Sequence, residues 1–131
     1  MFAAVSTNGR IVNGAIITFS QLHANIGSGL DKDTGLFNVP ISGLYRFYFS
    51  AMTATDHHFT YVYVVKNDVK TIFIHHNDRN DDGKNPNELL SYIWTMELNK
   101  GDTIKLKVEN NALLASGHYP IFYSGELLIE G

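Results

Sequence analysis

The segment from Thr34 to Ala51 restricts the fold of this chain more than any other. In its second half apolar and polar positions alternate, which is typical of a strand with one buried face. The face expected to be buried carries Tyr45, Phe47, Phe49 and Ala51. Ahead of this run, Gly35, Pro40 and Gly43 interrupt the chain as turn formers do. The segment therefore predicts a turn that leads into a long, aromatic, central strand.

Alternation of the same kind, separated by turn signals, marks further strands. We expect them at Phe2 to Ser6, Gly14 to Ser20, His58 to Val65, Val69 to His76, Glu88 to Leu98, Thr103 to Glu109 and Ile121 to Ile129. The strands on either side of Lys66-Asn67-Asp68 are expected to form a hairpin. The polar, glycine-rich run from Gln21 to Thr34 is expected to be an irregular surface loop.

The pattern of the strands also predicts which side chains face inward. In the strand ending at Leu98, these are Leu90, Tyr92, Trp94, Met96 and Leu98, and in the last strand Ile121, Tyr123, Gly125, Leu127 and Ile129. We expect the aromatic core to contain Phe37, Tyr45, Phe47, Phe49, Trp94 and Tyr123. No segment has helical periodicity, so the chain is predicted to be a single all-β domain over residues 1–131, an antiparallel sandwich or jelly roll.

Composition excludes several classes of function. The ten basic and 13 acidic residues give a net charge of −3, and the basic residues are spread along the chain, which argues against nucleic-acid binding. No apolar run approaches the roughly 18 residues that span a bilayer, so we expect no membrane insertion. Cysteine is absent, which removes disulfides, thiolate catalysis and sulfur-ligated zinc. Neither a nucleophile elbow nor a phosphate-binding loop is present, so we expect no enzymatic activity.

Short motifs in a fixed order carry a resemblance to a known family. They are Phe2-Ala3-Ala4-Val5, Gly35-Leu36-Phe37, Pro40, Gly43-Leu44-Tyr45-Arg46-Phe47, Lys66-Asn67, Leu98-Asn99-Lys100-Gly101-Asp102 and Phe122-Tyr123-Ser124-Gly125-Glu126-Leu127. In this order and spacing the chain resembles the globular-head domain of complement C1q over nearly its whole length. Asp68 stands where that family usually has Gly after Asn, and Tyr123 and Glu126 replace the commoner Phe residues of the last motif.

The resemblance implies a ten-stranded jelly roll, shared with tumour necrosis factor, that is secreted and assembles as a homotrimer. Apolar residues on both faces of the strands from Phe59 to Val65 and from Leu89 to Leu98 also favour a partner that covers one face. Relatives of this kind imply a lectin-like recognition module of innate immunity, which binds glycans or other surface patterns. The alternative is a signalling or assembly domain, similar to tumour necrosis factor or cerebellin, that binds a protein receptor in the grooves between protomers.

One acidic loop is a candidate calcium site. The run from Asp78 to Gly83 matches the opening of a calcium loop, and Asp78, Asn80 and Asp82 would supply the oxygen ligands. The closing acid is out of register, because Leu89 occupies the expected position and the carboxylate is on Glu88. A solvated turn between two strands is the other interpretation. Members of the resembled family bind Ca²⁺ through acidic loops, which keeps a calcium cofactor as an expectation.

Two more sets of residues are candidates for binding. His57-His58 and His75-His76 flank a predicted hairpin and could meet across it, although zinc would need a third ligand, and surface or interface histidines are the alternative. Glycans require hydrogen-bonding side chains beside aromatic faces. On that basis the candidate ligand-binding residues are Tyr48, Arg79, Lys84, Asn85 and Tyr119.

Overall fold

The computed structural model describes residues 1–131 except 8, 28, 55–59, 76–88 and 111. The described residues form strands and no helix, which confirms the all-β prediction. The strands are β1 (Phe2–Ser6), β2 (Gln21–Asn25), β3 (Phe37–Asn38), β4 (Gly43–Thr53), β5 (Tyr61–Lys66), β6 (Val69–His75), β7 (Leu89–Leu98), β8 (Thr103–Glu109), β9 (Leu113–Leu114) and β10 (Ile121–Glu130). No helix of the described residues is long and apolar enough to cross a membrane.

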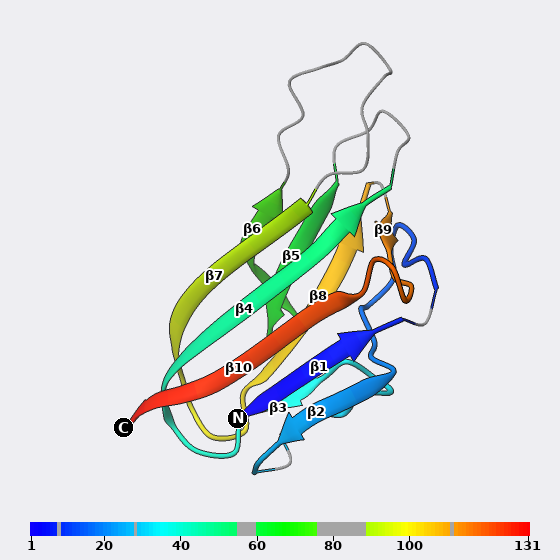
Figure 1. Ribbon diagram of the computed structural model, residues 1–131. Helices are drawn as coiled ribbons and strands as arrows, with labels where there is room; N and C mark the ends of the chain where they lie inside the picture. Colours follow the sequence, from blue (N-terminus) through cyan, green and yellow to red (C-terminus); the bar gives the residue numbers. More distant parts are fainter. Residues whose placement is uncertain (8, 28, 55–59, 76–88, 111) are drawn as a thin grey trace.

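The strands form two antiparallel sheets packed face to face (Figure 1). The six-stranded sheet has the order β2-β1-β10-β4-β7, with β9 paired to the end of β4. The four-stranded sheet has the order β3-β8-β5-β6. Each sheet therefore turns one face toward the shared core and leaves the other outside, and the outer faces point in opposite directions.

The central strand β4 behaves as its alternation predicts. It pairs with β10 on one side and with β7 on the other. Tyr45, Phe47 and Phe49 are buried, while Arg46 and Tyr48 between them are exposed. The strand β8 is equally regular, since Ile104, Leu106 and Val108 are buried and the residues between them are partly exposed. In both strands the period of two separates the core from the outer face.

Aromatic rings fill the centre of the sandwich. All six aromatic residues that we expected in the core, namely Phe37, Tyr45, Phe47, Phe49, Trp94 and Tyr123, are buried. Phe47 stacks on Trp94 with ring centroids 5.3 Å apart, and Phe2 contacts Tyr123 at 4.8 Å. Such contacts add about 0.5 to 1.5 kcal/mol each to the burial of apolar area. The first strand and the last strand thus meet in the core.

The structure corrects the predicted loop from Gln21 to Thr34, because its first five residues form β2. This strand pairs with β1, whose other edge pairs with β10. Conversely, the expected strand from Gly14 to Ser20 is reduced to an isolated bridge between Ile16 and Lys107. In the first case the free edge of β1 accepts a polar segment as a strand. In the second, the apolar segment still makes backbone hydrogen bonds to β8 at Gly14, Ala15 and Ile17 but does not extend them into a strand.

Two residues that we predicted to face inward are exposed. Tyr92 points toward the core side of the sheet but is 43% exposed, because β7 is the edge strand of its sheet. Ile129 is exposed because the pairing of β10 with β4 shifts by a residue between Leu127 and Ile129. A bulge of this kind re-aims every side chain beyond it.

Candidate functional site: the outer face of the six-stranded sheet

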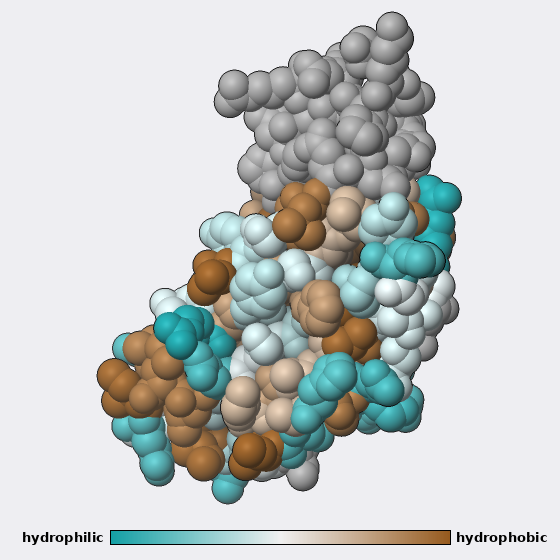
Figure 2. Space-filling view, in the orientation of Figure 1, coloured by the Kyte–Doolittle hydropathy of each residue, from teal (hydrophilic) through white to brown (hydrophobic). Residues whose placement is uncertain are grey.

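Large apolar side chains lie exposed on the outer face of the six-stranded sheet. Tyr48 of β4 is 39% exposed, Ile93 of β7 is 62% exposed and Phe122 of β10 is 46% exposed. Strand register brings them together, because Tyr48 is paired with Ile93 on one side and with Ser124 on the other. Figure 2 shows this face, with apolar patches between polar side chains and a larger one over the C-terminal end of β10. We call it the β4–β10 face.

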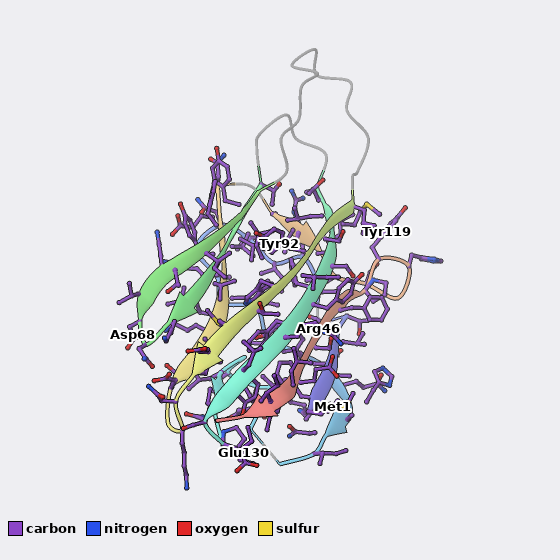
Figure 3. The ribbon with its side chains drawn as sticks, turned by 90° about the vertical axis from the view of Figure 1, so that its left-hand side faces the viewer. Met1, Arg46, Asp68, Tyr92, Tyr119 and Glu130 are labelled. Atoms are coloured by element: carbon purple, nitrogen blue, oxygen red, sulfur yellow. The ribbon has the colours of Figure 1, made fainter. Side chains whose placement is uncertain are left out.

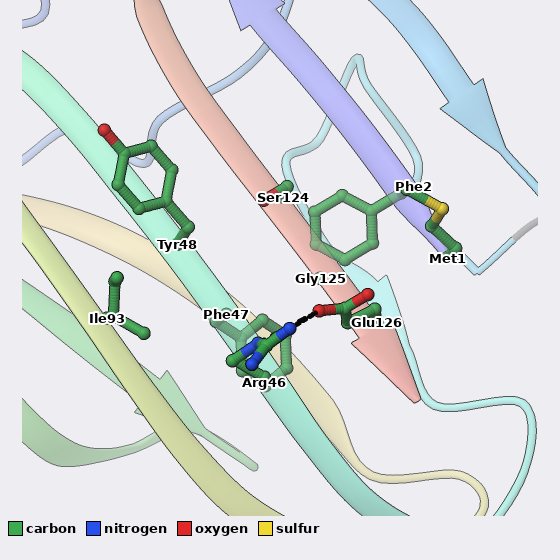
Figure 4. A pocket seen from close by; sticks show the side chains of 9 residues that line it. All are labelled: Met1, Phe2, Arg46, Phe47, Tyr48, Ile93, Ser124, Gly125 and Glu126. Carbon is green, nitrogen blue, oxygen red and sulfur yellow. Dashed lines mark hydrogen bonds and ion pairs between the residues drawn. The ribbon is translucent and has the colours of Figure 1, made fainter. Parts of the chain in front are cut away.

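A hollow of about 420 Å³ opens on the β4–β10 face (Figure 4). It is lined by Met1, Phe2, Arg46, Phe47, Tyr48, Ile93, Ser124, Gly125 and Glu126. A second hollow of about 180 Å³ is lined by Ala3, Ala4, Val5, His23, Tyr48, Phe122, Tyr123 and Ser124. Tyr48 and Ser124 border both, so the two hollows are parts of one shallow surface.

One ion pair stands in this apolar surface. Arg46 and Glu126 are cross-strand partners on β4 and β10, and Arg46 Nε donates a hydrogen bond to Glu126 Oε1 at 2.9 Å. The guanidinium also donates through its terminal nitrogen to the same oxygen. Both side chains are about half exposed, and an ion pair in that setting contributes less than about 1 kcal/mol to the fold. Covering by a second protein would remove the water and strengthen the attraction between the two charges.

The chemistry of the β4–β10 face is that of a protein contact surface. Exposed aromatic and aliphatic side chains around one arginine are the composition found at the centre of protein interfaces. Among the described residues, no group of three histidine, cysteine, aspartate or glutamate side chains is placed to hold a metal ion. The face thus presents two shallow hollows, exposed apolar area and one ion pair to a partner.

The groups with clearly shifted pKa values lie elsewhere. Hydrogen bonds from the Asn99 backbone N–H and from the Asn67 side chain lower the pKa of the Asp102 carboxyl, which ties the β7–β8 turn to the β5–β6 turn. Lys70 lowers the pKa of Glu109, and Glu109 raises that of Lys70 in return. Burial raises the pKa of the Tyr123 phenol far above its usual value. The shifts of Asp102, Glu109 and Lys70 thus follow from contacts that hold strands or turns together, whereas that of Tyr123 follows from its burial.

The predicted site residues do not form a cluster within the described part of the chain. Tyr48 lies on the β4–β10 face, whereas Tyr119 lies in the loop before β10, where its N–H donates to Ser116 Oγ at 3.2 Å (Figure 3). His75 ends β6, opposite Tyr61. The remaining candidates fall outside the described residues: Asp78, Arg79, Asn80, Asp82, Lys84, Asn85, His57, His58 and His76.

Sequence reasoning missed Ile93, Phe122 and the pair of Arg46 with Glu126. The pair joins residues 80 positions apart, so only the β4–β10 register reveals it. Ile93 and Phe122 alternate with residues that were predicted for the core, so the sequence places both on the outer face. It does not show that they lie near each other. Large apolar residues at outward positions of several strands were the available clue.

Comparison with solved structures identifies the fold. The globular domain of the zebrafish complement 1qA protein superposes with a TM-score of 0.75 at 16% identity, over 99% of this chain and 98% of that one. Murine APRIL superposes with a TM-score of 0.61 at 17% identity, over 95% of this chain and 99% of that one. These likenesses identify the two-sheet sandwich as the jelly roll that C1q and tumour-necrosis proteins share, as the sequence predicts.

Comparison of sequences identifies the family. The chain is 34% identical over 128 residues to complement C1q tumor necrosis factor-related protein 3 of Mus musculus and of Homo sapiens, which is 98% of this chain. It is 27% identical over 114 residues to caprin-2 of Danio rerio, 87% of this chain and 12% of that protein. The chain spans about half the length of the C1q tumor necrosis factor-related proteins that it matches. The family model for the C1q domain matches residues 1–128, and this chain therefore belongs to the C1q domain family.

Proposed function

We propose that this chain is an extracellular, non-enzymatic binding domain that assembles as a homotrimer and binds a protein receptor in the grooves between its protomers. Domains of the C1q and tumour-necrosis families typically form homotrimers. The observation that carries the proposal is the β4–β10 face, which exposes Tyr48, Ile93 and Phe122 around two hollows. The names of the matching relatives, which join C1q to tumour necrosis factor, support signalling or assembly as the role.

Assembly explains why these side chains are apolar. Removing apolar area from water contributes roughly 25 cal/mol per Å², so covering several large side chains on each of three protomers is a substantial driving force. The pair of Arg46 and Glu126 would fix the orientation, since a desolvated ion pair tolerates few arrangements of its neighbours. The grooves left between three such protomers are where a receptor would bind.

Glycan recognition is the second candidate, as a lectin-like module of innate immunity. The observation that favours it is a cluster of three exposed or partly exposed aromatic rings beside lysines on the outer face of the four-stranded sheet. Assembly would present three copies of that surface, and multivalency would raise a weak affinity for each site by orders of magnitude. Calcium binding by Asp78, Asn80 and Asp82 belongs with this candidate and stays a prediction.

One experiment separates the two candidates. The purified chain is first shown by light scattering to have the mass of three protomers, because a single-protomer mass would remove the receptor grooves from the proposal. Fluorescent trimer is then bound to cells that were treated with protease, with glycosidases or with neither. We expect protease to abolish binding if a protein receptor is the partner. Loss only after glycosidase treatment would support the glycan candidate instead.

The calcium prediction has its own test. Thermal melting with Ca²⁺ and with chelator should differ, because a ligand that binds only the folded state stabilises it by about 2.7 kcal/mol at a concentration 100-fold above its Kd. Asp78→Asn with Asp82→Asn should remove the difference. Identical melting of the unaltered protein in Ca²⁺ and in chelator would contradict the prediction.

A further inference from the structure

The outer face of the four-stranded sheet carries a second distinctive surface. Its aromatic part consists of Tyr61 and Tyr63 of β5 and Phe73 of β6, and its basic part consists of Lys70, Lys105 and Lys107. We call these six residues the aromatic–lysine surface. It lies on the opposite side of the sandwich from the β4–β10 face. Assembly through the β4–β10 face would therefore leave it open to solvent.

The aromatic part is held in place by its own contacts. Phe73 lies between the two tyrosines, with ring centroids 4.9 Å from Tyr61 and 5.1 Å from Tyr63. The register pairs Tyr63 directly with Phe73 across the β5–β6 hairpin. Phe73 is nevertheless 43% exposed, so part of this apolar cluster meets water. Rings fixed in this way can bind a flat apolar group with little loss of side-chain entropy.

The basic part surrounds a shallow cavity of about 170 Å³. Ile16 and Val65 supply its apolar lining, and Asp68, Lys70, Lys105 and Lys107 supply the charged groups. Lys70 also connects the two parts, because its Nζ lies 4.4 Å from the centre of the Tyr63 ring. A ligand in the cavity would thus lie next to the aromatic cluster.

The charges of the surface favour an anionic ligand. Three ammonium groups share two carboxylates: Lys105 pairs with Asp68 at 3.0 Å, while Lys70 and Lys107 both contact Glu109, at 2.6 and 3.6 Å. One positive charge is therefore left over within the group. The Asp68 side chain is 86% exposed, so its hold on Lys105 is a weak surface pair that an incoming anion can replace.

Asp68 lies in the β5–β6 turn, at the edge of the cavity. Its φ of +64° is a left-handed conformation, which costs a residue other than glycine roughly 1 to 2 kcal/mol. Its carboxylate accepts a hydrogen bond from Lys105 Nζ, in the cavity wall. Asn67, with a φ of +50°, and Asp68 are the two central residues of the β5–β6 hairpin turn, and such a turn requires a positive φ at both positions.

We propose that the aromatic–lysine surface binds an acidic saccharide, with the lysines holding a sulfate or carboxylate and the rings covering the apolar face of a sugar. Lysine pairs with such anions through charge-assisted hydrogen bonds. The C–H groups on one face of a pyranose carry partial positive charge and pack on the negative face of an aromatic ring. The inference rests on glycan recognition, the second function proposed above, and adds the site and the class of ligand.

Binding to defined probes tests the ligand class. The assembled protein is titrated by calorimetry or surface plasmon resonance with a heparin hexasaccharide, a fully desulfated hexasaccharide, cellohexaose and a polyglutamate of equal charge. We expect the heparin fragment to bind most tightly, with an affinity that falls as salt rises because screening weakens ion pairs. Cellohexaose and polyglutamate should each bind at least tenfold more weakly, since each lacks one of the two features. Equal binding of polyglutamate would overturn the proposal, because a bare polyanion would then suffice.

Substitutions test the site. Lys105→Gln with Lys107→Gln should weaken heparin binding by tenfold or more, whereas Lys32→Gln with Lys100→Gln removes the same charge outside the cavity and should change it less than twofold. Phe73→Ser should weaken binding of the hexasaccharide while leaving that of polyglutamate unchanged. Melting temperature and trimer mass are measured for each variant, so that loss of folding is not mistaken for loss of a contact.

Asp68→Asn is the most discriminating variant, because it should improve heparin binding, whereas a general loss of folding could only weaken it. Removing the carboxylate frees Lys105 for the ligand, while asparagine still tolerates the left-handed backbone. We expect heparin affinity to rise severalfold, and unchanged or weaker binding would overturn the proposed site. If the unaltered protein binds heparin but all surface variants bind equally well, the site is wrong and glycan recognition stands. If it binds no acidic saccharide, this ligand class is wrong, and the cell-binding experiment decides the function separately.

Discussion

Gly35 shows at the level of single residues how tightly the turn before the central strand is built. Its φ is +75°, and a Cβ atom added there would lie 2.0 Å from the carbonyl oxygen of Ile17. Backbone cannot move aside as a side chain can, so the clash adds to the cost of the left-handed conformation. The turn formers predicted from the sequence therefore include at least one position that only glycine can fill.

We expect Gly35→Ala to lower the free energy of unfolding by about 3 kcal/mol or more, from the clash and the backbone strain together. Gly101→Ala is the matched control, because Gly101 has a φ of +93° but no atom within 4 Å of the added Cβ. It should cost only about 1 kcal/mol for the conformation alone. Urea denaturation of both variants measures the difference, and equal losses would contradict the assigned clash.

Tyr123 makes a second prediction at this scale, in the opposite direction. Its hydroxyl is fully buried and has no hydrogen-bond partner among the described residues. A buried polar group without a partner costs about 1 to 3 kcal/mol of desolvation. Tyr123→Phe should therefore leave stability unchanged or raise it by about 1 kcal/mol in urea denaturation. A clear loss of stability would show that the hydroxyl has a partner, such as a buried water.

At the level of elements, the turns at the end of the four-stranded sheet are joined through Asp102. Its carboxylate accepts hydrogen bonds from the Asn99 N–H at 2.8 Å and from Asn67 Nδ2 at 3.0 Å. Asn67 Oδ1 in turn accepts from the Thr103 N–H at 2.9 Å. The β5–β6 turn and the β7–β8 turn are thus held as one unit next to the aromatic–lysine surface.

This unit should make stability depend on pH. The hydrogen bonds lower the pKa of Asp102 in the folded state below its ordinary value of 3.8, so the stabilisation is present above that pH and is lost as the pH falls below it. Asp102→Asn should cost about 1 kcal/mol near neutral pH. The difference between the two proteins in urea denaturation should shrink as the pH falls below 3.8 and the Asp102 carboxylate becomes protonated. A constant difference at all pH values would argue against the charged form as the cause.

The elements also show which signals the sequence carries. The strand β8 could be predicted because Ile104, Leu106 and Val108 alternate with charged residues, and hydrophobic period alone decides such a strand. The strand β2 is harder to predict, although Leu22 and Ala24 alternate with polar residues, because it has only five residues and its existence depends on the free edge of β1. The exposure of Ile129 depends on a shift in strand register that local sequence does not encode. Local sequence patterns therefore do not predict which distant segments pair with each other, or in which register.

At the level of the whole molecule, assembly should depend on the β4–β10 face. Ile93→Asp places a carboxylate in the wall of the larger hollow, where burial without a partner costs several kcal/mol. We expect the variant to stay folded but to have the mass of one protomer in light scattering at micromolar concentration. Val12→Asp is the control, since Val12 is similarly exposed but lies in a loop outside both hollows. A trimer that survives Ile93→Asp would exclude this face as the contact.

The candidate sites were only partly visible in the sequence. Tyr48 could be proposed because it is an aromatic residue at an outward position of a predicted strand. The neighbours that turn it into a surface, Ile93 and Ser124, come from strands far along the chain. Likewise, Lys105 and Lys107 look like an ordinary solvated strand face until the cavity with Asp68 and Lys70 is seen. The sequence shows which residues could bind a ligand, but only the fold shows which of them lie close together.

The place of β1 in the sheet has a consequence for how the chain reaches its fold. This strand, formed by residues 2–6, lies between β2 and β10, and Phe2 pairs with Gly125 at the far end of the sequence. During synthesis β1 must therefore wait until β10 has been made before their part of the sheet can close. Pairings so distant in sequence make for slow folding, in milliseconds to seconds, and leave strand edges open meanwhile. The domain should become resistant to protease only after β10 has left the ribosome.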